Sequence, residues 1–168
     1  LNIEDLEQFL ANHPAIRSAQ VYTSQEGDLN IELKQKKAVV RIKTKTDDYY
    51  LDELGKVMPL SANYTPRVLV VTGDVSAEHH TEIYKFVKIV SADEFWNSQI
   101  TQLHYIHDEV VIIPRVGAHT VQFGLLQNFE DKLENLYQFY KQAMPVKGWQ
   151  AYSDISLKYN NQIVCTKK

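Results

Sequence analysis

The chain has 168 residues, a hydrophobic content of 44% and a formal net charge of −3. This length supports one large domain or two small ones, and this apolar content excludes wholesale disorder. The slightly negative charge gives no global attraction to nucleic acid or to an anionic membrane. Because Cys165 is the single cysteine, an internal disulfide and a multi-cysteine metal site are both excluded.

The first predicted elements are a helix and a hairpin. Asn2 is the expected N-cap of the helix, and His13-Pro14 ends it, because proline disfavours helical geometry in the residue before it. Residues 16–23 are rich in β-forming side chains, and a turn at 25–28 leads to a second strand. Along residues 29–34 apolar and polar side chains alternate, which predicts a strand buried on one face.

The remainder of the chain predicts an α+β class, with helices placed between groups of strands. Strands are expected at 39–43, at 68–71 and in a hairpin over 49–60, followed by a helix from 76 to about 99. Further strands at 100–107, 109–116 and 119–123 precede a helix over 128–144. A terminal hairpin then joins 154–159 to 162–167 around Asn160-Asn161. Its last strand leaves an open sheet edge, which we predict binds another protein.

No motif predicts a catalytic residue, a bound cofactor or a metal site. The chain lacks a nucleophile elbow, a phosphate-binding glycine loop and the H-E-x-x-H pattern. The pairs Asp52-Glu53 and Asp108-Glu109 each lie at an expected hairpin turn, where acidic side chains are common for solvation and turn chemistry. Only Lys158 beside Tyr159 fits the pattern of tyrosines interleaved with basic residues, so sheet packing explains the tyrosines better than nucleic-acid binding does. A small hydrolase or ligand-binding enzyme that uses the histidines remains the alternative of a different class.

The chain resembles the FtsQ/DivIB family of bacterial division proteins. Residues 2–41 resemble the second half of a POTRA module, and 49–61 with 67–73 resemble the start of the family's β domain. Residues 155–167 are similar to the family's C-termini, most like those of the Bacteroidota. The resemblance implies a truncated POTRA-like helix-hairpin unit (partial POTRA domain, 1–42). An FtsQ-type β domain (43–168) would follow, as a mostly antiparallel mixed sheet with two long helices.

The resemblance also implies a function. Members are non-catalytic scaffolds at the division septum that hold the FtsB–FtsL pair. This chain would correspond to the periplasmic part of such a single-pass inner-membrane protein. We therefore expect FtsB-like and FtsL-like partners, with other division proteins as further partners of the POTRA half. The chain begins at Leu1, so we expect it to be a piece of a longer protein, with contact to the membrane only through a transmembrane helix absent from this chain. Another POTRA-containing envelope protein, for outer-membrane or secretion assembly, is the runner-up.

The expected mechanism is addition of a partner strand to the last sheet edge. Two alternatives stay open: Tyr159 packs only within its own sheet, or the terminal lysines guard the edge against pairing. The residues expected to bind the partner are Lys158, Tyr159, Gln162, Ile163, Val164 and Cys165.

Overall fold

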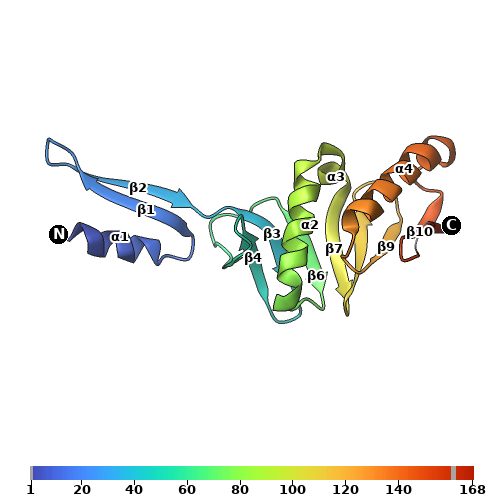
Figure 1. Cartoon of the computed structure of the whole chain (residues 1–168), viewed down its shortest axis with the longest axis horizontal. Helices are drawn as coiled ribbons and strands as arrows, with labels where there is room; N and C mark the ends of the chain where they lie inside the picture. Colours follow the sequence, from blue (N-terminus) through green and yellow to red (C-terminus); the bar gives the residue numbers. More distant parts are fainter. Residues whose placement is uncertain (1, 160–161) are drawn as a thin grey trace.

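The computed structural model describes residues 2–159 and 162–168, and these residues form two separate sheets (Figure 1). The small sheet pairs β1 (Ile16–Thr23) with β2 (Leu29–Gln35) in antiparallel fashion, and α1 (Ile3–Ala11) packs against β1. Asn2 caps α1, as the sequence predicts, by accepting a hydrogen bond from the Glu4 N–H at 3.2 Å. Figure 1 shows these three elements, here called the arm, projecting from one side of the large sheet.

The large sheet has nine strands over the described residues, in the order β11-β10-β9-β8-β7-β6-β3-β4-β5. The β3–β6, β6–β7 and β9–β10 pairs are parallel and the others are antiparallel, which confirms a mostly antiparallel mixed sheet in an α+β fold. Its helices are the 3₁₀ turn η1 (Ala77–His79), α2 (His80–Ala92), α3 (Glu94–Gln99) and α4 (Phe129–Lys147). Its strands are β3 (Ala38–Lys43), β4 (Asp48–Asp52), β5 (Val57–Met58), β6 (Leu69–Gly73), β7 (Ile100–Ile106), β8 (Glu109–Pro114), β9 (Thr120–Gly124), β10 (Tyr152–Ser156) and β11 (Val164–Lys167).

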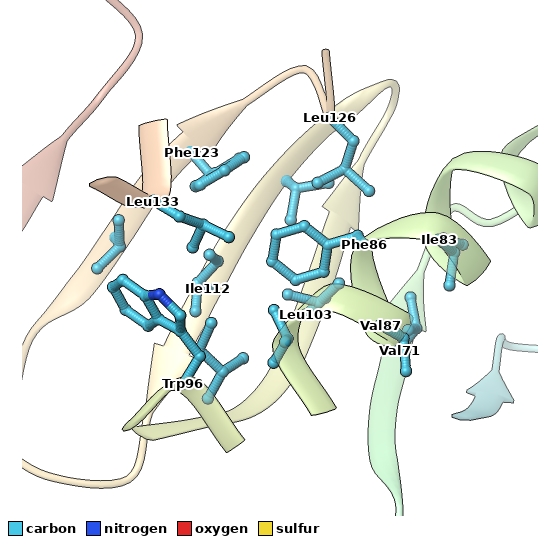
Figure 2. Packing of buried hydrophobic residues seen from close by; sticks show 14 of the residues in the cluster. Val71, Ile83, Phe86, Val87, Trp96, Leu103, Ile112, Phe123, Leu126 and Leu133 are labelled. Atoms are coloured by element: carbon cyan, nitrogen blue, oxygen red, sulfur yellow. The ribbon is translucent and has the colours of Figure 1, made fainter. Parts of the chain in front are cut away.

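A single hydrophobic core lies between α2, α3 and α4 and the large sheet. Figure 2 shows Phe86 of α2 pointing into this core among side chains from β7, β8 and β9. Its ring meets Phe123 and Phe129 edge to face, at centroid distances of 5.7 and 5.4 Å, which is a favourable aromatic geometry. One continuous row of paired residues crosses the sheet beneath the helices: Ile42, Val71, Leu103, Ile112, Val121, Ile155 and Cys165.

The helix predicted from 76 to about 99 is broken at Asp93. This residue has extended backbone angles (φ −98°, ψ 122°), and its carboxylate accepts a hydrogen bond from the Trp96 N–H at 2.9 Å. The cap satisfies an N–H group that a new helix start would otherwise leave unpaired. The chain therefore turns between α2 and α3, and Trp96 enters the core.

Replacing Asp93 with alanine is expected to destabilise the protein by about 1 kcal/mol, because the cap of α3 is lost. Urea denaturation measures the change. Asp93→Asn is the matched control, since its amide oxygen can still accept the Trp96 hydrogen bond and should retain most of the stability. Equal losses in both variants would show that the cap is not what stabilises this turn.

The prediction that strand 29–34 is buried on one face is wrong. Leu29, Ile31 and Leu33 remain 43%, 46% and 48% exposed. They lie opposite Thr23, Val21 and Ala19 of β1, and α1 packs mainly on β1. No element of the described chain covers the β2 half of this face, so the alternating pattern produces a strand but not its burial.

The arm joins the large sheet through Glu53, which follows β4. Its carboxylate accepts a hydrogen bond from the Arg17 guanidinium at 2.9 Å, which is also an ion pair, and a second hydrogen bond from the Lys37 N–H at 2.6 Å. The predicted domain boundary, between residues 42 and 43, falls inside β3, whose residues all lie in the large sheet. The division into a partial POTRA domain and a β domain stays a prediction.

Candidate partner-binding edge

β11 forms one outer edge of the large sheet, and among the described strands it pairs only with β10. The Thr166 carbonyl accepts a hydrogen bond from the Ser153 hydroxyl at 3.3 Å, and the Lys168 N–H donates to the Ala151 carbonyl at 3.3 Å. The backbone groups of these two residues therefore face β10. Because backbone groups alternate in direction along a strand, those of Cys165 and Lys167 point away from the sheet. No described strand pairs with them on that side, so they can pair with a further strand.

The opposite edge of the sheet is guarded. β5 contains only Val57 and Met58, and Pro59 follows directly. A very short edge strand and a proline both discourage pairing with another chain. Of the two edges, β11 is therefore the better template for an added strand.

A groove of about 560 Å³ lies beside this edge, between α4 and the segment that leads into β11. The terminal segment contributes Tyr159, Gln162 and Ile163. The facing side of α4 contributes Phe139 and a row of amide side chains, each of which can both donate and accept hydrogen bonds. The amide residues of this row are Asn135, Gln138 and Gln142.

The lysines near the groove are already engaged within the protein. The Lys132 ammonium donates to the carbonyls of Phe123 and Leu125 at 3.1 and 2.7 Å, and burial lowers the pKa of this ammonium. Lys158 forms an ion pair with Glu109 of β8 and does not line the groove. Recognition in the groove would therefore rest mainly on the amides, on the tyrosine, on the Asp131 carboxylate and on apolar contacts.

Comparison with known proteins decides the family. The model of the family described as FtsQ/DivIB, C-terminal related, matches residues 37–166, which is well over half of the chain. The chain belongs to this FtsQ/DivIB-related family. The match begins one residue before β3 and ends within β11, so it covers the large sheet and leaves the arm outside. The FtsQ/DivIB family consists of non-catalytic cell division proteins.

Among solved structures, the chain is similar to the major extracytoplasmic domain of the trans isomer of the bacterial cell division protein DivIB from Geobacillus stearothermophilus. The two share 15% sequence identity with a TM-score of 0.46, and the alignment covers 67% of this chain and 98% of that one. No curated protein matches the sequence.

In this FtsQ/DivIB-related chain, the residues expected to bind a partner separate into three places. Tyr159, Gln162 and Ile163 line the groove, and Val164 and Cys165 lie on the β11 edge. Lys158 alone points elsewhere, toward Glu109. The expected turn at Asn160-Asn161 lies outside the described residues. That these six residues contact a partner stays a prediction.

The α4 side of the groove was not anticipated from the sequence. Asn135, Gln138 and Gln142 are separated by three and four residues, which places them on one helical face. This spacing was the available signal, but an amide row on an exposed helix face is also what solvation alone produces. Only the packing of α4 beside the terminal hairpin makes the row one wall of a groove in this FtsQ/DivIB relative.

Cys165 takes part in packing, and its environment disfavours reactivity. Its side chain is half-buried at the end of the core row, next to Ile155. Burial raises the pKa of the thiol, and the negative charge of Asp154 raises it further. The thiolate, which is the reactive form, is therefore disfavoured at neutral pH. In this member of the FtsQ/DivIB-related family, Cys165 exposes its backbone groups, and not a reactive thiol, at the outer edge of the sheet.

Proposed function

We propose that this chain is a non-catalytic scaffold of the bacterial division machinery that recruits the FtsB–FtsL pair by strand addition to β11. The observation that carries the proposal is the outward direction of the Cys165 and Lys167 backbone groups on an outer strand of the large sheet. An added strand would gain affinity from main-chain hydrogen bonds, and the adjoining groove would select its side chains. Membership of the FtsQ/DivIB-related family supports this choice of partner.

Tyr159 is the proposed aromatic anchor of the interface. It is 56% exposed and lines the groove, so a partner side chain can pack against its ring. Tyrosine is among the residue types that contribute most to binding energy at protein interfaces. The alternative, in which Tyr159 packs only within its own sheet, predicts no effect of its removal on binding.

The proposed location is the periplasm, as part of a single-pass inner-membrane protein at the division septum. The family assignment supports this location. None of the helices in the described part of the chain is both long and apolar enough to cross a membrane. The arm, which lies outside the family match, is the proposed contact surface for other division proteins.

The test is a titration of this chain with the periplasmic segment of the FtsB-like protein from the same genome. We expect the wild type to bind, Tyr159→Ala to bind roughly tenfold more weakly, and a truncation after Asn161, which removes β11, to lose binding. Tyr64→Ala is the matched control, because Tyr64 is 70% exposed and does not line the groove.

Circular dichroism and thermal melting establish that each variant remains folded. The proposal fails if the wild type does not bind at high micromolar concentrations. It also fails if folded Tyr159→Ala and truncated chains bind as tightly as Tyr64→Ala, because the partner would then dock elsewhere.

A further inference from the structure

A second hollow lies on a different part of the large sheet. Its volume is about 640 Å³, and it forms where β3, β6 and β7 begin, beneath the end of α2. Because these three strands are parallel, their amino-terminal ends meet at the same end of the sheet. Figure 1 shows α2 lying across these strands, several strands away from β11.

Four cationic side chains line this hollow, and no aspartate or glutamate does. The four are Lys37, Arg67, Lys88 and Arg115, and we call the hollow the cationic cleft. Such a concentration is unexpected in a chain whose formal net charge is −3. Like charges brought together repel one another, which costs free energy unless a ligand of opposite charge compensates it.

The described part of the protein does not neutralise these charges. None of the four side chains forms an ion pair with a described residue. Arg115 donates from Nε to the Ser98 carbonyl at 2.9 Å, and the Lys88 ammonium lies 5.6 Å from the centre of the Tyr84 ring. Both contacts involve uncharged groups, so all four positive charges remain available to a ligand.

Apolar side chains line one part of the cationic cleft, here called its floor. Val39, Val68 and Leu69 are half-buried and contribute to it, whereas Ser91, Asn97 and Thr101 make other parts of the lining polar. An apolar floor with a charged rim is the general arrangement of a protein-binding surface, in which apolar contacts give affinity and charges give orientation and specificity. A small anion such as phosphate would use the cations but would leave the floor uncovered.

We propose that the cationic cleft binds an acidic peptide segment of a partner protein, in which carboxylates flank an apolar side chain. The apolar side chain would cover the floor, and the carboxylates would pair with the four cations. A flat anionic lipid surface fits less well, because the site is hollow and the chain as a whole carries net negative charge. This surface is separate from the β11 edge, and the inference does not depend on the function proposed for that edge.

The test uses a fluorescein-labelled peptide, Glu-Ser-Glu-Leu-Glu-Leu-Glu-Ser-Glu, and a second peptide in which glutamine replaces every glutamate. Fluorescence anisotropy should show the acidic peptide binding to the wild-type chain with a dissociation constant below about 1 mM. Added salt should weaken this binding, because exposed charge pairs are screened. The glutamine peptide should bind at least roughly tenfold more weakly, because the complementary charges are lost.

The decisive variant is Arg67→Glu combined with Lys88→Glu. Both side chains are exposed, so the protein is expected to fold, and binding of the acidic peptide should fall at least roughly tenfold. Lys56→Glu combined with Lys85→Glu makes the same change in net charge outside the cleft, at exposed positions, and should bind as the wild type does. Tyr159→Ala, a variant of the β11 site, should also bind the acidic peptide normally.

Four results would overturn the inference. The first three are no binding of the acidic peptide to the wild type, equal binding of the two peptides, and equal losses of binding in the two double variants. The fourth is that the wild type binds phosphatidylglycerol vesicles and not the peptide, and that this vesicle binding depends on Arg67 and Lys88. The last result would assign the cationic cleft to a lipid surface.

Discussion

Replacing Cys165 with proline is expected to weaken binding of the proposed partner strand roughly tenfold to a hundredfold. The Cys165 N–H points away from β10, so proline removes no hydrogen bond within the protein. A partner strand would lose that donor, and the proline ring would obstruct the edge. The partner carbonyl left unpaired adds to the loss, since an unsatisfied buried acceptor costs about 1–3 kcal/mol. Isothermal titration calorimetry with the FtsB-like segment measures the change.

Two further variants separate the edge from the side chain. Cys165→Ala keeps the N–H and should bind almost as the wild type does. Thr166→Pro removes an N–H that faces β10, so it should lower the melting temperature, whereas Cys165→Pro should change it little. If Cys165→Pro binds as tightly as Cys165→Ala, the partner does not pair with this edge and strand addition is wrong.

Replacing Gly73 with alanine is expected to destabilise the large sheet by about 3–5 kcal/mol. Gly73 ends β6 with φ +93°, and an added Cβ would lie 2.1 Å from the carbonyl oxygen of Tyr105 on β7. That carbonyl accepts a hydrogen bond from the Asp74 N–H at 3.1 Å. The clash can be relieved only by moving one backbone segment away from the other, which would weaken this hydrogen bond. Urea denaturation followed by tryptophan fluorescence measures the loss.

Gly148→Ala is the control for the backbone angle alone. Gly148 follows α4 with φ +79°, and nothing lies within 4 Å of the position that its Cβ would occupy. Alanine there should cost only the conformational strain, about 1–3 kcal/mol. Similar losses at the two positions would indicate that β6 and β7 can separate without penalty, contrary to the geometry of the sheet.

Most of the fold could be predicted because its strong patterns are local. The β-rich runs between residues 100 and 123 and the apolar stripe of α4 appear where their periodicity places them. α4 continues past Met144 to Lys147 with Pro145 inside its last turn, although proline removes a backbone N–H and disfavours helical geometry in the residue before it. The break at Asp93 was missed because apolar residues continue on both sides of it. The exposure of Leu29 was missed because an alternating pattern cannot say whether another element covers it.

The candidate site could be predicted only in part. A terminal β-branched strand is a local feature, and it lies at the sheet edge as expected. The groove depends on α4 lying beside residues 159–163, which no local pattern encodes. The ion pair of Lys158 joins residues on β8 and in the terminal segment, so its sequence neighbours carry no sign of it. Tertiary placement, more than residue type, separates the groove-lining residues from Lys158.

The strand order also sets a distance between the two surfaces. The strands at the cationic cleft, β7, β6 and β3, are separated from β11 by four to six inter-strand steps, or about 19 to 29 Å at the usual spacing of about 4.8 Å. A segment of a few residues held at one surface would therefore not overlap a segment held at the other. The large sheet would act as a rigid spacer that presents two occupants at a fixed separation, without competition between them.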